Sequence, residues 1–210
     1  MSDNASALQD DATEPQAKRQ RMKPGERREQ ILQTLASMLE QPGAERITTA
    51  LLASKLDVSE AALYRHFASK AQMFEALIEF IEHSVFSLIN QIAERDEDPA
   101  HKAARMVAVV LQFGEKNPGM TRVMVGDALV FEHERLQKRV NHLFDRVESS
   151  LRGALREAAE ATQSATPSAD AHVRAAALVA YTLGSLQRFA RSEFQRSPLE
   201  HLDASLALLI

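Results

Sequence analysis

Apolar residues along the chain recur every three or four positions, the spacing of an α-helix with one buried face. The clearest stripe predicts a long helix from Ser69 to about Arg95, and Ser69 with Gln72 forms a capping box at its start. The stripe consists of Phe74, Leu77, Ile78, Ile81, Val85, Leu88, Ile89 and Ile92. No segment alternates apolar and polar residues between turn signals, as a half-buried strand would. The pattern therefore predicts an all-α protein.

Further helices are expected on both sides of this one. An N-terminal helix should begin near Gly25 or Glu26 and stop at Pro42-Gly43, because proline lacks the amide donor and glycine permits the exit geometry. After the long helix, the expected helical ranges are 100–116, 120–126, 129–161, 172–194 and 199–210. Asn117-Pro118-Gly119 should form a tight turn and residues 162–169 a loop, since both stretches have turn composition.

Two short helices are predicted between residues 47 and 67. Thr48 and Thr49 form an N-cap pair for a helix to about Leu56, and Ser59 caps a second helix to about His66. The apolar positions that should face inward are Leu52, Ala53, Leu56, Val58, Leu63 and Phe67. Helices of two turns bury little surface alone, so the pair should pack over the N-terminal helix as a helix-turn-helix.

The composition excludes several classes of protein. The chain contains 45% apolar and 26% charged residues, as an ordinary globular protein does. It contains no cysteine, which excludes disulfides and thiolate chemistry. No uncharged apolar run approaches the ~18–20 residues that cross a bilayer, so we expect a cytoplasmic protein with no membrane partner. Phosphate-binding glycine loops and GxSxG are absent, and His133 has no second histidine four residues away. We therefore expect no catalysis, metal or cofactor.

The net charge of −4 is distributed unevenly. Residues 1–17 carry four acids and no base, residues 18–70 carry ten bases and six acids, and residues 71–210 carry fifteen bases and nineteen acids. A basic block before an acidic body is typical of a small DNA-binding unit attached to another domain. We expect a disordered tail over 1–22, a DNA-binding domain over 23–70, and a helical dimerisation and partner-binding domain over 71–210.

The end of the second short helix resembles the signature of the TetR family, Leu-Tyr-x-His-Phe-x-x-Lys. It is present here as Leu63-Tyr64-Arg65-His66-Phe67-Ala68-Ser69-Lys70. The resemblance implies a TetR-like fold, with a three-helix DNA-binding domain followed by a helical C-terminal domain. Asp57 departs from the glycine that the family usually has in the turn. That position should have a positive φ, which aspartate tolerates better than most side chains.

The resemblance and the side-chain chemistry together assign DNA-binding roles. The second short helix of such a motif lies in the major groove with its N-terminal residues at the base edges. Donors to phosphate are expected at Thr48, Tyr64, His66 and Lys70, and base-edge or backbone contacts at Ser59, Glu60 and Arg65. Ala61 and Ala62 are small enough for the helix to enter the groove deeply, and Thr49 is assigned to the DNA-binding surface as well.

Three alternatives to these roles remain open at this point. Tyr64 could pack on the N-terminal helix, and His66 could cap the end of its own helix. The basic run from Lys18 to Arg28 could enter a flanking minor groove or form a solvated tail.

Three further stretches, residues 47–84, 113–148 and 188–198, resemble one branch of the TetR family, the nucleoid occlusion factors. This resemblance implies a nucleoid-associated inhibitor of cell division that binds palindromic double-stranded DNA and antagonises polymers of the tubulin-like protein FtsZ. It places the FtsZ groove along the long helix and the one after it, and assigns Phe80, Lys116 and Asn117 to it. Phe80 and Phe86 lie off the apolar stripe, which leaves two alternatives open for each: exposure as the anchor of a protein interface, or packing on a neighbouring helix of the same chain.

Binding to a palindrome requires a two-fold dimer, with higher-order assembly on DNA left open. The expected dimer surface comprises Leu178, Val179, Leu183 and Leu186, for which the alternative is the core of the chain. The rival function is a small-molecule-responsive repressor on the same fold. Such a repressor would need a pocket of convergent polar groups among the body helices.

Overall fold

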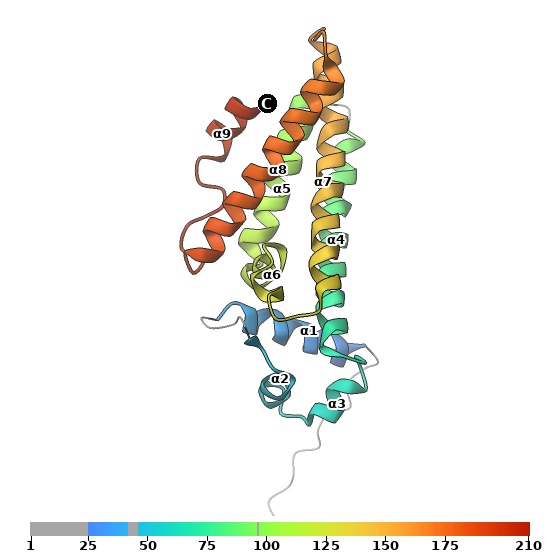
Figure 1. Ribbon diagram of the computed structural model, residues 1–210, viewed down its shortest axis with the longest axis vertical. Coiled ribbons are helices and arrows are strands. Elements are labelled where there is room, and N and C mark those ends of the chain that lie inside the picture. Colours follow the sequence, from blue (N-terminus) through green and yellow to red (C-terminus); the bar gives the residue numbers. More distant parts are fainter. Residues whose placement is uncertain (1–24, 42–45, 96) are drawn as a thin grey trace, which may run out of the picture.

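The computed structural model describes residues 25–41, 46–95 and 97–210, and every regular element in these ranges is helical (Figure 1). The elements are α1 (Glu26–Leu39), α2 (Thr49–Lys55), α3 (Glu60–Tyr64), α4 (Lys70–Ala93), α5 (Pro99–Lys116), α6 (Pro118–Met124), η2 (Asp127–Leu129), α7 (Glu134–Ala161), α8 (Pro167–Arg191) and α9 (Leu202–Leu209). The predicted all-α class is confirmed. The predicted tail over 1–22 and the Pro42-Gly43 stop lie outside the described ranges.

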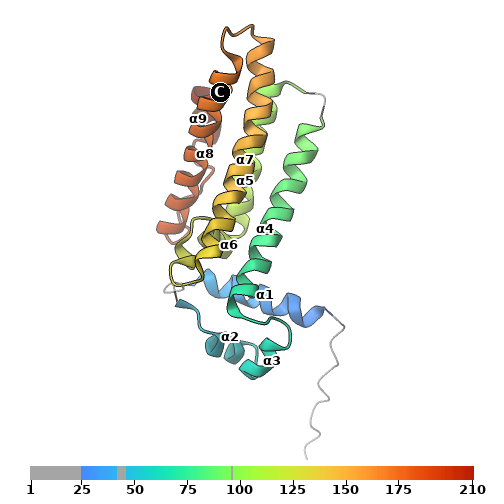
Figure 2. The same ribbon diagram turned by 45° about the vertical axis from the view of Figure 1, so that its right-hand side comes forward.

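The short helices α1 to α3 form the base of the molecule, and α4, α5, α7 and α8 run side by side along its long axis (Figures 1 and 2). α6 lies between the base and this bundle and contacts α1, α4, α5 and α8. α9 lies against α8. The base is therefore held by two helices of the body, α4 and α6.

The base and the body share one apolar core. Ile31 and Leu35 of α1 are fully buried in the same cluster as Leu77 of α4. α6 approaches α1 so closely that a Cβ atom added at Gly119 would lie 2.0 Å from the carbonyl oxygen of Ala36. Only glycine permits this approach, because every other residue carries the Cβ atom.

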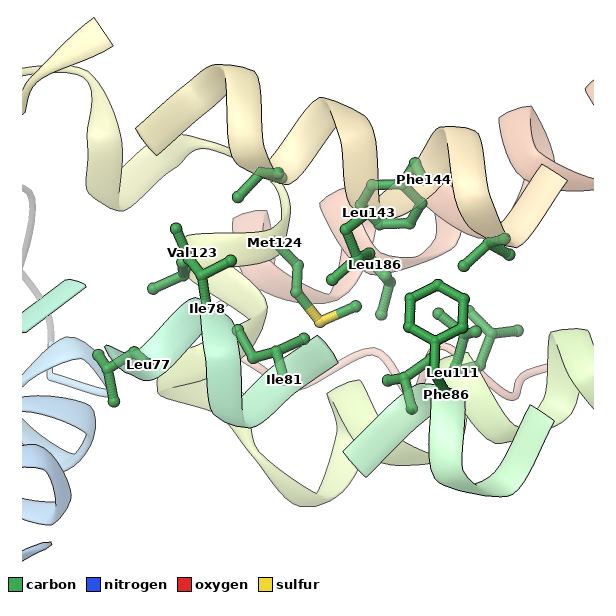
Figure 3. Packing of buried hydrophobic residues seen from close by; sticks show 14 of the residues in the cluster. Leu77, Ile78, Ile81, Phe86, Leu111, Val123, Met124, Leu143, Phe144 and Leu186 are labelled. Atoms are coloured by element: carbon green, nitrogen blue, oxygen red, sulfur yellow. The ribbon is translucent and has the colours of Figure 1, made fainter. Parts of the chain in front are cut away.

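Within the body, large side chains from four helices point toward one another (Figure 3). Ile81 and Phe86 come from α4, Met124 from α6, Leu143 from α7 and Leu186 from α8, and each is at least 93% buried. Burying one such side chain contributes about 1.5–3 kcal/mol. The body is therefore a helical bundle held together by a close-packed apolar core.

The connections at Asn117 and Pro167 differ from the predicted ones. Asn117 alone separates α5 from α6, so the predicted turn at 117–119 is wrong: Pro118 and Gly119 already belong to α6. Pro167 opens α8, which shortens the predicted loop to residues 162–166. Proline suits the first position of a helix, because the amide hydrogen that it lacks would have no partner there.

The stripe predicted for α4 is wrong at two positions. Leu88, assigned to the buried face, is 46% exposed, whereas Phe86, which lies off the predicted stripe, is only 7% exposed, so its alternative of packing within the chain is confirmed. α7 crosses α4 on the side of Phe86, and the guanidinium of Arg146 lies 3.8 Å from the centre of its ring. Neighbouring helices decide which flank of a wide stripe is buried, and a single-helix pattern cannot supply that information.

Candidate nucleic-acid interface and partner surface

Local hydrogen bonds shape the two short helices of the base. The hydroxyl of Thr48 accepts from the amide of Leu51 at 3.2 Å and opens α2, and the hydroxyl of Ser59 accepts from the amide of Ala62 at 3.3 Å and opens α3. Between the helices, Asp57 has φ 52°, the left-handed conformation expected where the TetR signature usually has glycine. The caps and the turn therefore lie where the sequence predicts them.

The inward residues of α2 and α3 join the apolar cluster to which α1 contributes, with α2 packed on α1 and α3 packed on α2. Leu52, Ala53, Leu63 and Phe67 are buried, and Leu56 and Val58 are half-buried. Arg28 of α1 lies over the Phe67 ring at 4.1 Å and donates to the carbonyl oxygen of His66 at 3.0 Å. Arg28, predicted to belong to a DNA-binding arm or a solvated tail, thus holds the end of the motif onto α1.

The outer face of α3 is open to solvent. Ser59, Glu60, Ala61, Tyr64 and Arg65 are exposed, and Ala62 is half-buried. The carboxylate of Glu60 accepts from the hydroxyl of Thr49 at 2.5 Å, which joins the start of α3 to α2. Tyr64 is 46% exposed, so packing on α1 does not account for this side chain. α3 thus presents small and polar side chains together, away from the core.

The expected phosphate donors surround this face. Thr48 and His66 are exposed, and Arg65 rather than His66 caps the end of α3. Lys70, at the first position of α4, is half-buried and forms an ion pair with Glu132 from the loop between η2 and α7. The ammonium of Lys70 is therefore already engaged in the DNA-free protein. Sequence reasoning missed Glu132, because it lies 62 residues away and carries no local signal.

The residues assigned to the FtsZ surface meet around Phe113 of α5. Phe80 is 49% exposed, and its ring centre lies 6.4 Å from that of Phe113. The side-chain amide of Asn117 donates to the Phe113 carbonyl at 2.7 Å, so this group is engaged in closing α5. Lys116 is exposed beside it, and Leu88 adds a second apolar side chain on α4. Together, Phe80, Leu88, Phe113 and Lys116 form what we call the α4–α5 surface.

The predicted dimer surface needs correction. Leu178 and Leu186 are fully buried within the single chain, and Val179 is 8% exposed, so these side chains belong to the core. Only Leu183 of the predicted set is half-buried. The opposite face of α8 is exposed and carries Val173, Ala176, Ala180 and Gly184. α8 has two apolar faces, one with large and one with small side chains. The helical spacing of the sequence does not show which of the two faces the core of the chain.

A polar seam joins α4 to α7. Arg139 donates to both carboxylate oxygens of Glu82, at 2.6 and 3.2 Å, and to the carbonyl of Glu75 at 3.2 Å. The hydrogen bond with Glu82 raises the pKa of the Arg139 guanidinium above its ordinary value. Arg135 pairs with the Glu75 carboxylate at 2.7 Å, one turn earlier. These pairs fix the register of the two helices, and their partners are about 60 residues apart in sequence.

The part of the chain that the structure describes contains no group of three or more His, Cys, Asp or Glu residues placed to hold a metal ion. Within that part, no helix is long and apolar enough to cross a membrane.

Two family models match the chain. Residues 31–77 match the model for bacterial regulatory proteins of the tetR family, and residues 100–210 match the SlmA-like model for a Tetracyclin repressor-like C-terminal domain. Solved structures agree in fold. FadR of Bacillus subtilis, in complex with stearoyl-CoA, has a TM-score of 0.68 at 13% identity, covering 87% of this chain and 97% of that one. PfmR of Thermus thermophilus has a TM-score of 0.68 at 21% identity, covering 87% and 94%. The TetR-like fold is confirmed.

Curated relatives are much more similar in sequence. Nucleoid occlusion factor SlmA of Vibrio cholerae is 51% identical over 184 residues, which cover 87% of this chain and 93% of that protein. SlmA of Vibrio vulnificus is 50% identical over 188 residues, covering 89% and 95%. SlmA of Salmonella paratyphi A is 48% identical over 184 residues, covering 87% and 92%. The similarity thus extends over both the base and the body.

Proposed function

Because the chain belongs to the SlmA family of nucleoid occlusion factors, we propose that it binds palindromic DNA sites as a dimer and, from there, antagonises FtsZ polymers. Its role is nucleoid occlusion, and it binds DNA through a TetR-type helix-turn-helix. In this proposal residues 23–70 bind DNA and residues 71–210 dimerise and bind the partner. The parts of this function that we propose are the palindromic sites, the partner FtsZ and the residues that make each contact.

One observation carries the DNA-binding assignment of individual residues. α3 buries Leu63 while Ser59, Ala61 and Arg65 remain exposed on its outer face. In the major groove, a small side chain at Ala61 lets the helix backbone approach the bases and can contact a thymine methyl group. Tyr64 and His66, exposed at the end of the helix, are placed to donate to phosphate oxygens on the flank.

We assign the α4–α5 surface to FtsZ. Two apolar side chains about half exposed, Phe80 and Leu88, lie on one flank of α4, and aromatic side chains commonly anchor protein interfaces. Lys116 supplies a positive charge at the rim of this surface, which favours an apolar segment that also carries acidic residues. Phe80 and Lys116 would act directly on the partner. Asn117 would act by holding the end of α5 in place.

Co-sedimentation with FtsZ polymers tests the proposal. The full chain should pellet with the polymers. The fraction of the chain in the pellet should increase when a duplex carrying its cognate palindrome is added. Mapping of bound sites across the genome gives a second readout, for which we expect many dispersed sites. A single promoter-proximal site, together with no co-sedimentation at several salt concentrations, would instead support a small-molecule-responsive repressor.

A further inference from the structure

The segment that contains η2 and leads into α7, residues 126–133, has a defined local structure at both ends. Gly126 has φ 86°, and a Cβ atom there would lie 2.7 Å from the side-chain oxygen of Gln137. At the other end, the ring nitrogen Nδ1 of His133 accepts from the amide of Arg135 at 3.2 Å and caps α7. Between these ends the loop crosses the base of the body beside α1 (Figure 1).

The middle of this loop contacts both flanks of the helix-turn-helix. Glu132 pairs with Lys70 at the start of α4, and the exposed fractions of the two side chains are 10% and 25%. The guanidinium of Arg46, two residues before the Thr48 cap of α2, lies 5.8 Å from the ring centre of Phe131. Two cations that flank the motif are thus engaged by a single loop of the body.

Given the proposed function in DNA binding, we propose that the Lys70–Glu132 ion pair is an autoinhibitory contact that a DNA phosphate displaces, which releases the 126–133 loop. A phosphate that approaches Lys70 also approaches the Glu132 carboxylate, and two like charges at short range repel each other. Lys70 must therefore exchange Glu132 for the phosphate. The free energy needed to break the ion pair makes the free energy of DNA binding less favourable by the same amount.

The pair is partly buried, so its strength lies near the upper end of the range for surface ion pairs, about fivefold in an equilibrium constant. A dimer breaks two such pairs, which makes the expected penalty about 25-fold in DNA affinity. Coupling of this kind is reciprocal, so DNA binding shifts the loop toward its released state by the same factor.

The released loop can act on the body because it leads directly into α7. Arg135, in the first turn of α7, pairs with Glu75 of α4, and Arg139 pairs with Glu82 one turn later. A change in the loop therefore reaches the α4–α7 seam without passing through another element. Occupation of the DNA site would be transmitted to the body along this route.

The first test compares Glu132→Gln with Glu134→Gln in the full chain. Glu134 lies two residues away, is 74% exposed and pairs with Lys138 of its own helix, so its replacement removes the same charge without breaking an ion pair with the base. Binding is measured by fluorescence anisotropy on a palindromic duplex and on a scrambled one. We expect Glu132→Gln to bind both duplexes about 25-fold more tightly, because phosphate contacts are independent of sequence. Glu134→Gln should stay within about twofold of the wild type.

A double-mutant cycle identifies Lys70 as the group that Glu132 restrains. Lys70→Ala should weaken binding to both duplexes and lower the salt dependence by about 0.9 per protomer, since one phosphate contact is lost. Adding Glu132→Gln to Lys70→Ala should then give a clearly smaller gain in affinity than it gives in the wild type, because no ion pair has to be broken and only the repulsion between Glu132 and the phosphate is relieved. A gain in affinity of equal size in both backgrounds would overturn the proposal.

A tryptophan reports the loop itself. The chain contains no tryptophan, and Phe131 is 67% exposed, so Phe131→Trp introduces a single probe next to Glu132. We expect duplex DNA to shift its emission, and we expect Phe131→Trp/Glu132→Gln to show the shifted emission before DNA is added. Equal shifts in both proteins would contradict the release of the loop. If the wild type binds neither duplex, the proposed function fails; if it binds and Glu132→Gln matches Glu134→Gln, only the autoinhibitory contact fails.

Discussion

Replacing Gly119 by alanine tests how rigidly the base is joined to the body. The added Cβ would lie 2.0 Å from the carbonyl oxygen of Ala36, whereas real Cβ atoms stay at least 3.0 Å from such an atom. The clashing atom belongs to the backbone of α1, so no side chain can move aside. α1 and α6 must therefore separate by about 1 Å, a gap at which packed atoms lose a quarter to a half of their dispersion energy.

We expect Gly119→Ala to lower the free energy of unfolding by about 2–3 kcal/mol, the upper part of the range for overpacked cores. Urea unfolding followed by circular dichroism measures this difference. Gly153 of α7 is the matched control, because a Cβ atom there meets nothing within 4 Å. Gly153→Ala should stabilise the protein by up to about 1 kcal/mol, since alanine is the better helix former.

The two variants should also differ in DNA affinity. Gly119→Ala displaces the helix on which α2 and α3 pack, so binding should weaken, whereas Gly153→Ala should bind like the wild type. If Gly119→Ala unfolds at the same urea concentration as Gly153→Ala, α1 and α6 can separate with little loss of stability. The reasoning that the base is held rigidly by α6 would then be refuted.

Three further outcomes are expected. Phe80→Ala should leave DNA affinity within twofold while reducing co-sedimentation with FtsZ by about tenfold or more, as for an interface anchor; loss of both activities would place Phe80 in the core. Ala180→Glu should turn the dimer into a monomer in sedimentation velocity, whereas Leu186→Ala should remain a dimer and lose about 3 kcal/mol in unfolding; the reverse pattern would mean that the faces of α8 are assigned wrongly. Hydrogen bonds from Ser164 and Thr166 lower the pKa of Asp170, so its stabilising effect is present at neutral pH and fades as the pH falls through the lowered pKa. The difference in unfolding free energy between the wild type and Asp170→Asn should therefore vanish in acid, and a difference independent of pH would argue against this cause.

The sequence predicts those features whose physical cause is local. Thr48 and Ser59 cap helices whose free amides lie three residues on, and both caps are present in the structure. Asp57 takes the left-handed conformation because the turn requires it within the same few residues. Such features depend on neighbours in the chain, so a single sequence is sufficient to predict them.

Features that depend on how distant elements cross could not be predicted. The burial of Phe86 depends on Arg146 and α7, and the ion pair of Lys70 depends on Glu132, 62 residues away. In both cases the local pattern was compatible with the opposite outcome. A lysine at the start of α4 looks free in the sequence, because no rule of helical spacing connects it with a loop of the body.

α8 shows how a regular pattern can leave two structures open. Its inner face carries Leu178 and Leu186, fully buried within the chain, while its outer face carries Ala176, Ala180 and Gly184 at intervals of four residues. Both faces are apolar enough to be buried, so periodicity alone does not decide between core and interface. Size decides, because large side chains fill the space inside the bundle, whereas small ones allow the backbone of a second helix to come close. We therefore expect a second copy to pack on the outer face of α8.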